Sequence, residues 1–285
     1  MLCERLSAHT SLRVGGCAQF FGAPDSQREL QDLLCLAEAN ELPWIPLGAG
    51  TNLLFGNQGY DGLVIQTTRL HGRSLVGGCL RVGAGELLRS VAWSACEAGL
   101  SGLEWAVGIP GTIGGAVAMN AGAYGGQTAD VLLSVESVTA KRATIRTSEE
   151  LSLGYRTSAY RTGALEEVVV EATLQLARST PAQVMREAER LQALRRASQP
   201  IGATAGSVFR NPLQPPTAGQ LLDRAGCKGM RVGRAVVSAE HANVIVNEGS
   251  DNAADVLALI DRMKACVREV FGVDLEEEIV IVDSV

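Results

Sequence analysis

The sequence has 285 residues, of which 46% are hydrophobic and 20% charged, a composition that fits a globular protein of about two domains. Its 25 Lys and Arg are outnumbered by 31 Asp and Glu, and this net charge of −6 disfavours functions that depend on neutralising nucleic-acid phosphates. Aromatic residues make up only 4%, too few for stacking platforms, so no nucleic-acid partner is expected.

The cysteines and histidines point away from disulfides and metals. Seven cysteines form no CxxC pair, which is typical of free thiols in a reducing compartment. Three histidines are too few for a histidine-rich metal centre, so no metal ligands are predicted. The N-terminal residues lack a basic segment followed by an apolar one, so we expect no signal peptide and a cytoplasmic location.

The first half of the chain alternates predicted helices and strands. Ser26 and Glu29 form a capping box before a helix, and short apolar strands are predicted at 44–47 and 62–65. Further elements are a strand at 79–82, a helix at 86–98 that Gly99 ends, and strands at 131–139 and 168–176.

A domain boundary is predicted near residue 178. Thr180, Pro181 and Gln183 are typical of a helix start, and the helix should run to Ala197. The final part has predicted strands at 243–247 and 278–282, and a helix at 253–271 between Asn252 and Gly272. This order of elements predicts an α+β protein in two parts, the first of which holds two subdomains.

One uncharged segment, residues 105–129, is long enough to span a bilayer. Its seven glycines, proline and polar residues would make a poor spanning helix. We therefore interpret it as buried loop and strand, and expect no membrane association.

Glycine is concentrated in loops at 48–52, 108–115 and 120–125. Because glycine has no side chain, its backbone N–H groups can approach an anion closely, and an acidic protein that binds phosphate needs such neutral donors. Neither of the first two loops has the GxGxxG pattern of a dinucleotide-binding turn. Tight turns alone would also explain any one loop, but three together favour a phosphate-bearing ligand.

These loops belong to longer motifs that occur along the whole chain. In the first half the motifs are HTSLRVGG (9–16), PLGAGTNLL (46–54) and GIPGTIGGAVAMNAGAYG (108–125). In the second half they are GYRTS (154–158), AGSVFRNP (205–212), HAN (241–243) and LEEEI (275–279). Together and in this order, they resemble the UDP-N-acetylenolpyruvoylglucosamine reductase family, which acts in peptidoglycan precursor synthesis. The short interval between Tyr160 and Val168 is similar to that of the shorter, type II subfamily.

The resemblance implies a vanillyl-alcohol-oxidase-type FAD-binding fold followed by an α+β substrate domain. Residues 1–178 would bind FAD non-covalently, in subdomains of about 1–72 and 73–178, and residues 179–285 would bind the UDP-sugar. NADPH would be the co-substrate, and the enzyme would be a monomer. The FAD pyrophosphate would contact Leu47, Gly48, Ala49, Gly50, Thr51, Asn52 and Leu53. The isoalloxazine would contact Pro110, Gly111, Gly114, Gly115, Ala116, Asn120, Ala121, Gly122 and Tyr124.

The resemblance also implies three catalytic residues. Ser207 would be the proton donor and Arg156 the group that stabilises developing negative charge, since a guanidinium stays protonated and grips carboxylates. Glu278 would help to stabilise the enol intermediate, although Glu276 and Glu277 leave its register open. Alternation predicts that Glu278 shares a strand face with Val280 and Val282, and that Glu277 shares the other with Ile279. Taken alone, the three residues would equally fit a polar turn, a surface arginine and a solvated acidic run.

Substrate contacts are assigned by resemblance to Tyr155, Asn211, His241 and Asn243, and His241 could instead be structural. Two departures affect the diphosphate site. Gly202, Ala203 and Thr204 replace a longer Pro- and Ser-containing segment, and Ser198 stands where the family commonly has lysine. Three arginines remain as candidate partners of the diphosphate: Arg195, Arg196 and Arg210.

Two other functions would share the glycine loops. One is a different flavin enzyme of the same fold, such as an alcohol or sugar oxidase, which would lack the ordered set Arg156, Ser207 and Glu278. The other is a non-catalytic protein that binds a flavin or a nucleotide sugar.

Overall fold

The computed structural model describes residues 2–282, and its chain divides into two compact units. Unit 1 contains residues 1–20, 50–62 and 196–285, and unit 2 contains residues 21–49 and 63–195. This division differs from the predicted boundary at 178/179. The helix that follows that boundary, α4 (Pro181–Ser198), packs Val184, Ala188 and Leu191 into the core of unit 2.

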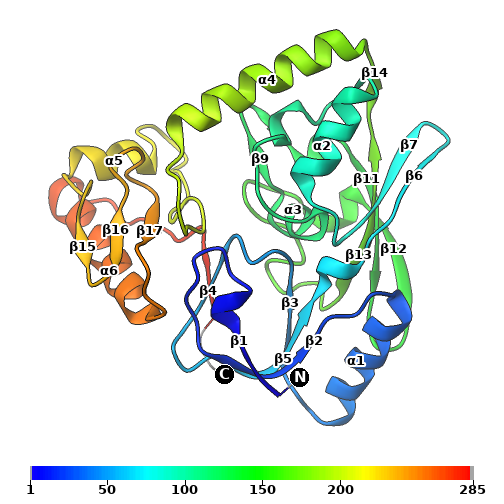
Figure 1. Ribbon diagram of the computed structural model, residues 1–285, viewed down its shortest axis with the longest axis horizontal. Coiled ribbons are helices and arrows are strands. Elements are labelled where there is room, and N and C mark those ends of the chain that lie inside the picture. The colour runs from blue at the N-terminus through cyan, green and yellow to red at the C-terminus, as the bar shows by residue number, and fades with distance from the viewer. Residues whose placement is uncertain (1, 283–285) are drawn as a thin grey trace. The chain divides into compact units, whose positions relative to one another are not determined.

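Unit 2 is built on an antiparallel sheet with strand order β12-β11-β13-β7-β6 (Figure 1). Helices α2 and α3 pack on this sheet through an apolar core that includes Val91, Val117 and Ala172. The sheet strands are β6 (Arg73–Val76), β7 (Cys79–Gly83), β11 (Leu132–Val138), β12 (Ala143–Thr147) and β13 (Val168–Gln175). The helices are α2 (Leu88–Glu97) and α3 (Ile113–Met119).

The remainder of unit 2 lies before and between these elements. Strand β3 (Trp44–Leu47) pairs in parallel with the last residues of β5 (Tyr60–Gln66). Helix α1 (Gln27–Ala39) precedes β3. Short strands are β8 (Leu100–Ser101), β9 (Gly122–Ala123), β10 (Gly126–Gln127) and β14 (Ala177–Arg178). Short 3-10 helices are η2 (Thr67–Arg69), η3 (Glu104–Ala106), η4 (Thr128–Asp130) and η5 (Ser148–Leu151).

Unit 1 packs two helices, α5 (Ala218–Arg224) and α6 (Ala253–Phe271), with a small antiparallel sheet of order β15-β16-β17 (Figure 1). The strands of this sheet are β15 (Arg231–Val232), β16 (Ala235–Val237) and β17 (Ile245–Asn247). Elsewhere in the unit are β1 (Leu2–Arg5), η1 (Leu6–Ala8), the start of β2 (Cys17–Gly22), β4 (Leu53–Phe55) and β18 (Val280–Val282). Strands β1 and β2 pair antiparallel, and β4 and β18 pair parallel.

Most predicted elements are confirmed, although two strands are shorter than predicted and several observed elements were not predicted. Helix α6 has the predicted bounds because the Asn252 side chain accepts the Ala254 N–H and Gly272 adopts the left-handed conformation. Strands β17 and β18 are shorter than predicted, since the Val244 and Glu278 N–H groups bond to loop carbonyls instead. Strand β6 was not predicted; it forms a hairpin with β7 around Gly77 and Gly78, both at positive φ.

The uncharged segment 105–129 folds within unit 2 as short elements and loops, with α3 as a helix where we expected loop or strand. None of the helices within residues 2–282 combines the length and apolar character needed to cross a bilayer.

Candidate active site

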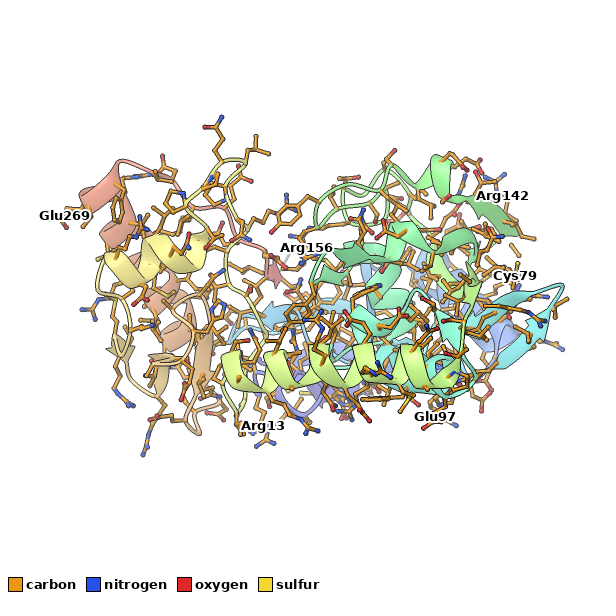
Figure 2. The ribbon with its side chains drawn as sticks, turned by 90° about the horizontal axis from the view of Figure 1, so that it is seen from above. Arg13, Cys79, Glu97, Arg142, Arg156 and Glu269 are labelled. Carbon is orange, nitrogen blue, oxygen red and sulfur yellow. The ribbon has the colours of Figure 1, made fainter. Side chains whose placement is uncertain are left out.

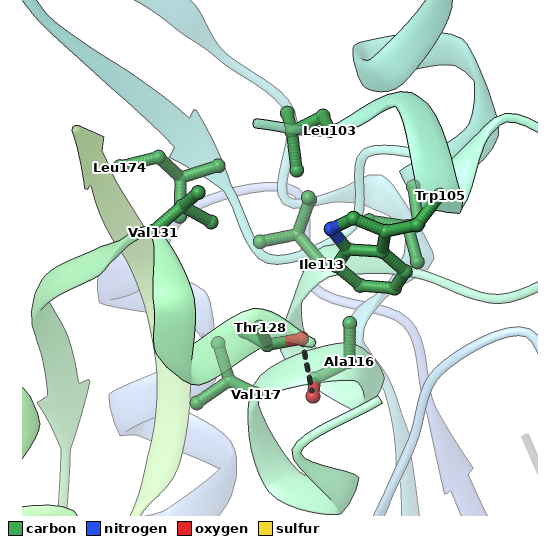
Figure 3. A pocket seen from close by; sticks show the side chains of 9 residues that line it. Leu103, Trp105, Ile113, Ala116, Val117, Thr128, Val131 and Leu174 are labelled. Atoms are coloured by element: carbon green, nitrogen blue, oxygen red, sulfur yellow. Dashed lines mark hydrogen bonds between the residues drawn. The ribbon is translucent and has the colours of Figure 1, made fainter. Parts of the chain in front are cut away.

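The cavity detected in unit 2 is a void in its apolar core and not a ligand site (Figure 3). Its volume is about 10 Å³, barely enough for one water molecule. Leu103, Ile113 and Leu174 are among its apolar lining residues, and the Thr128 hydroxyl beside it donates to the Ala116 carbonyl.

The second glycine loop leads into α3 through Thr112. This buried side chain accepts the Gly115 N–H at 3.3 Å and so caps the helix. A Cβ on Gly48 would lie only 2.5 Å from the Thr112 Oγ1, so the start of the first glycine loop packs directly on this cap. Thr112 was not among the predicted site residues, although threonine before an apolar helical run is a capping signal.

Gly115 presents open space at the start of α3. It is exposed, and a Cβ built there would meet only the Thr112 Oγ1, at 3.5 Å. Gly111, just before the helix, has a φ of +124°. A large cofactor could thus approach the backbone at Gly115 without displacing protein atoms, and this observation fits the predicted FAD contact.

The first glycine loop continues into unit 1. Gly50 has a φ of +62°, and a Cβ there would lie 2.1 Å from the His9 carbonyl oxygen, so only glycine fits. Its own carbonyl accepts the Ser11 N–H at 3.0 Å. Asn52 follows; its Nδ2 donates to the Glu278 carbonyl at 3.2 Å, and its carbonyl accepts the Val280 N–H at 2.9 Å. The end of this loop and the Glu278 segment are therefore joined within unit 1.

Helix α3 ends at Met119, and the Asn120 that caps it has a left-handed φ of 41° and is 1% exposed. Its Nδ2 donates to the Gly154 carbonyl at 2.8 Å and to Gln127, and its Oδ1 accepts the Ala129 N–H at 2.9 Å. These bonds use the amide within the protein. Tyr124 follows at the tip of the β9–β10 hairpin, where it is exposed.

Arg156, which is labelled in Figure 2, lies on a tight turn between Gly154 and Thr157, and the Asn120 amide donates to the Gly154 carbonyl. Gly154 and Thr157 exchange backbone hydrogen bonds at 3.1 and 3.3 Å, and Arg156 between them has a φ of 54°. A left-handed non-glycine residue costs about 1 kcal/mol or more, and such strain is common at functional sites. The Arg156 Nη2 donates to the Gly122 carbonyl at 2.5 Å.

The guanidinium of Arg156 is also 5.2 Å from the ring centroid of Tyr155, a cation–π distance. Tyr155 itself is exposed. The hydrogen bond from Arg156 to Gly122 connects the predicted charge-stabilising group with the predicted isoalloxazine segment, and both belong to unit 2.

Ser207 and Glu278 come together in unit 1. Ser207 is paired with Val244 on one side, and Phe209 is paired with Glu277 on the other. Between them, the Val208 carbonyl accepts the Glu278 N–H at 2.7 Å. The predicted proton donor and the predicted carboxylate therefore lie on adjacent backbone segments, whereas Arg156 belongs to unit 2.

The two glutamates that precede Glu278 have different surroundings. Glu277 forms an ion pair with Lys264 at 2.7 Å, and Glu276 is exposed. Strand β18 begins only at Val280, so the predicted alternation does not extend back to Glu278. Ile279 is 4% exposed, while the Glu277 side chain is 29% exposed, so these two do not share one environment.

The predicted substrate residues of unit 1 have different surroundings. Asn211 is exposed, and its Oδ1 accepts the Ala218 N–H at the start of α5. His241 is partly buried, and its Nδ1 accepts the Asn243 N–H at 3.2 Å. Asn243 is 2% exposed, and both ends of its amide bond to the backbone of Phe209.

The candidate diphosphate cations also differ. Arg195 lies in unit 2, where its Cδ would be 2.6 Å from a Cβ on Gly108 and where burial lowers the pKa of the guanidinium. Arg196 and Arg210 lie in unit 1. Among residues 2–282, no group of three or more His, Cys, Asp and Glu side chains could hold a metal ion.

Two protein-family models match this chain, one in its N-terminal part and one near its C-terminus. Residues 18–148 match the model of an FAD binding domain. Residues 198–282 match the model described as UDP-N-acetylenolpyruvoylglucosamine reductase, C-terminal domain.

Relatives match over nearly the whole chain. The UDP-N-acetylenolpyruvoylglucosamine reductase of Synechococcus elongatus is 44% identical over 96% of this chain and 91% of its own length. That of Gloeobacter violaceus is 41% identical over 96% and 93%. The crystal structure of UDP-N-acetylenolpyruvylglucosamine reductase from Thermus caldophilus covers 97% of both chains with 37% identity and a TM-score of 0.83.

The fold and these matches define a flavin-dependent oxidoreductase with an FAD-binding domain of the vanillyl-alcohol-oxidase type and a separate α+β C-terminal domain. Within that class, the chain belongs to the UDP-N-acetylenolpyruvoylglucosamine reductase family, as its motifs predict.

Proposed function

We propose that this protein uses NADPH to reduce the enolpyruvyl group of UDP-N-acetylenolpyruvoylglucosamine, forming UDP-N-acetylmuramate for peptidoglycan synthesis. Family membership over the whole chain supports the substrate. The observation that carries the mechanism is the adjacency of Ser207 and Glu278 through the Val208 carbonyl. Residues 1–178 would then serve FAD and residues 179–285 the UDP-sugar, in a monomeric cytoplasmic enzyme.

FAD would be held without a covalent bond by the two glycine loops and the segment after α3. The open backbone at Gly115 supports this assignment. When bound, FAD would accept hydride from NADPH and pass it to the terminal carbon of the enol ether. The Thr112 cap, which contacts both loops in unit 2, would fix their relative geometry.

Ser207 would deliver a proton to the substrate α-carbon. A hydroxyl is a weak acid, so it must be oriented in advance, and pairing with Val244 restricts its backbone. A positioned general acid contributes about 10²–10⁴-fold to rate. Glu278 would stabilise the enol-like intermediate. It must do so while protonated or hydrogen-bonded, because a bare carboxylate repels an enolate.

Arg156 would bind the substrate carboxylate as negative charge grows on it. Its guanidinium stays protonated, and the strained turn and the Gly122 contact restrict where it can point. Tyr155, Asn211 and His241 would contact the UDP-sugar. Arg195, Arg196 and Arg210 stay alternatives for the diphosphate, and the placement of Arg195 against Gly108 favours a role near the glycine loop for that residue.

The experiment follows flavin absorbance in each half-reaction. The purified protein should bind FAD, be reduced by NADPH, and be reoxidised by the enolpyruvyl sugar. Ser207→Ala should retain FAD binding and reduction by NADPH, while reoxidation by the sugar slows by about 10²–10⁴-fold. Ser207→Cys, which can still donate a proton, should recover part of this loss.

Four results would contradict the proposal. Flavin reduction without reoxidation by the sugar would indicate another flavin oxidoreductase, such as a sugar oxidase. FAD binding without reduction would indicate a binding protein. Reoxidation of the alanine variant at the wild-type rate would remove Ser207 from the proton-donor role, and a uniform loss in both half-reactions would make it a structural turn residue.

A further inference from the structure

Asn243 forms a clasp around the backbone that follows Ser207. The Phe209 N–H donates to the Asn243 Oδ1 at 2.9 Å, and the Asn243 Nδ2 donates to the Phe209 carbonyl at 2.8 Å. The Asn243 carbonyl also accepts the Val208 N–H at 2.9 Å. Three hydrogen bonds from one residue thus hold two consecutive residues beside the predicted proton donor.

These bonds are buried. Asn243 is 2% exposed and Phe209 is fully buried, with Val208 also in the core of unit 1. The backbone groups of Phe209 cannot turn to water if the amide is lost, and an unsatisfied buried group costs about 1–3 kcal/mol. Only a side chain with a donor and an acceptor at this spacing satisfies both groups, which is what asparagine supplies.

The clasp reaches both predicted catalytic residues of unit 1. Ser207 directly precedes Val208, and the Val208 carbonyl accepts the Glu278 N–H at 2.7 Å. Fixing Val208 and Phe209 therefore fixes the backbone of Ser207 and its separation from the Glu278 backbone. The amide is bonded at both ends and Asn243 is 2% exposed, so the side chain presents almost no surface to a substrate.

We propose that Asn243 is a positioning residue that sets the geometry of Ser207 and Glu278 through Phe209 and Val208, and that it does not bind the UDP-sugar. This inference rests on the proposed function. It differs from the resemblance-based expectation that Asn243 contacts substrate.

Asn247 provides a matched control in the same unit. It is also buried, at 6% exposed, and its Nδ2 donates to the Leu12 and Ser250 carbonyls while its Oδ1 accepts the Gly249 and Ser250 N–H groups. Its side chain has no hydrogen bond to Val208 or Phe209 in the part of the chain described. Asn247→Ala therefore tests the general cost of removing a buried amide.

The test compares Asn243→Ala, the milder Asn243→Ser and Asn247→Ala in stopped-flow measurements on the FAD-loaded enzyme. In both Asn243 variants, flavin reduction by NADPH should stay within about twofold of wild type. The limiting rate of reoxidation by the enolpyruvyl sugar should fall at least tenfold, with the half-saturating sugar concentration changed less than about twofold. Asn247→Ala should lower the melting temperature while reoxidising at close to the wild-type rate. Asn243→Ser replaces the amide with a hydroxyl that can still form a hydrogen bond, and it provides the comparison if the alanine variant does not fold.

A double-mutant cycle makes the assignment specific. If Asn243 acts through Ser207, adding Asn243→Ser to Ser207→Ala should cause little further loss of the reoxidation rate. Losses that multiply would refute positioning through Ser207, and so would an equal loss of rate in Asn247→Ala. A raised half-saturating concentration with an unchanged limiting rate would make Asn243 a substrate contact. Failure of the wild-type enzyme to reoxidise with the sugar would refute the proposed function itself, a result visible before any variant is compared.

Discussion

The substitution Gly115→Ala should have opposite effects on the stability of the apoprotein and on its affinity for FAD. In the structure the added methyl group would meet only the Thr112 Oγ1, at 3.5 Å, an ordinary van der Waals contact. Gly115 lies in the first turn of α3 and its φ is not positive, so alanine is compatible with the backbone. Alanine is favoured over glycine in a helix by about 0.5–1 kcal/mol, so the apoprotein should become more stable by that amount.

FAD binding should change in the opposite direction. If the cofactor packs against the backbone at Gly115, the methyl group occupies part of its volume, and overpacking costs about 1–3 kcal/mol. The dissociation constant for FAD should then rise by roughly 5- to 150-fold. For the apoprotein, the helix stabilisation of about 0.5–1 kcal/mol corresponds to a melting temperature about 1–4 °C higher, at about 2–4 °C per kcal/mol.

The assay titrates deflavinated protein with FAD, follows flavin fluorescence, and measures the melting temperature of each apoprotein. Gly56→Ala is the control, because a Cβ there meets nothing within 4 Å, its φ is not positive and it is outside the predicted FAD contacts. Unchanged FAD affinity in Gly115→Ala, together with a stabilised apoprotein, would show that FAD does not approach this residue and that the loop has another role.

Two further predictions concern unit 2. Arg156→Lys keeps the charge but loses the planar fork, so turnover should fall by roughly 10²-fold or more while FAD affinity, measured by fluorescence, is retained; near-normal turnover would remove Arg156 from charge stabilisation. Glu167, whose side chain is 5% exposed, accepts from Arg146 at 2.9 Å and from Ser137, and these bonds hold its pKa below the usual value. A depressed carboxyl pKa stabilises the fold above the unfolded-state value near 4.5 and loses that contribution as pH falls through the folded-state value. Glu167→Gln should therefore cost about 3 kcal/mol in urea unfolding at neutral pH, and the difference from wild type should shrink below about pH 4.5; a pH-independent difference would contradict this account.

Local signals predicted the longer helices and several strands, but not shorter elements such as α5 and β12. The capping Asn252 and the terminal Gly272 define α6 because both act within one turn of the helix they bound. Strand β6 was not predicted, although Gly77 and Gly78 are a hairpin signal. All four residues of β6 are exposed, so this strand has no buried face that would impose an alternating apolar pattern on the sequence.

The features of the candidate site that could not be predicted from the sequence are hydrogen bonds between residues far apart in the chain. Asn243 and Phe209 are 34 residues apart, and Asn120 and Gly154 are also 34 residues apart, so no local pattern relates them. The left-handed φ of Arg156 was equally hidden, because arginine has no intrinsic preference for it. Motif resemblance assigned chemistry to these segments but could not say which polar side chains face the protein.

In each unit, a buried asparagine side chain forms hydrogen bonds with the backbone near a predicted catalytic residue. The predicted catalytic residues Arg156 and Ser207 lie outside regular strands, where no ladder of backbone hydrogen bonds fixes them. Buried backbone polar groups must still be paired, and a side-chain amide can supply the missing bonds. Asn120 does this for the Arg156 turn and Asn243 for the Ser207 segment. In both segments, a side-chain amide distant in the sequence therefore supplies backbone hydrogen bonds that a strand ladder would otherwise provide.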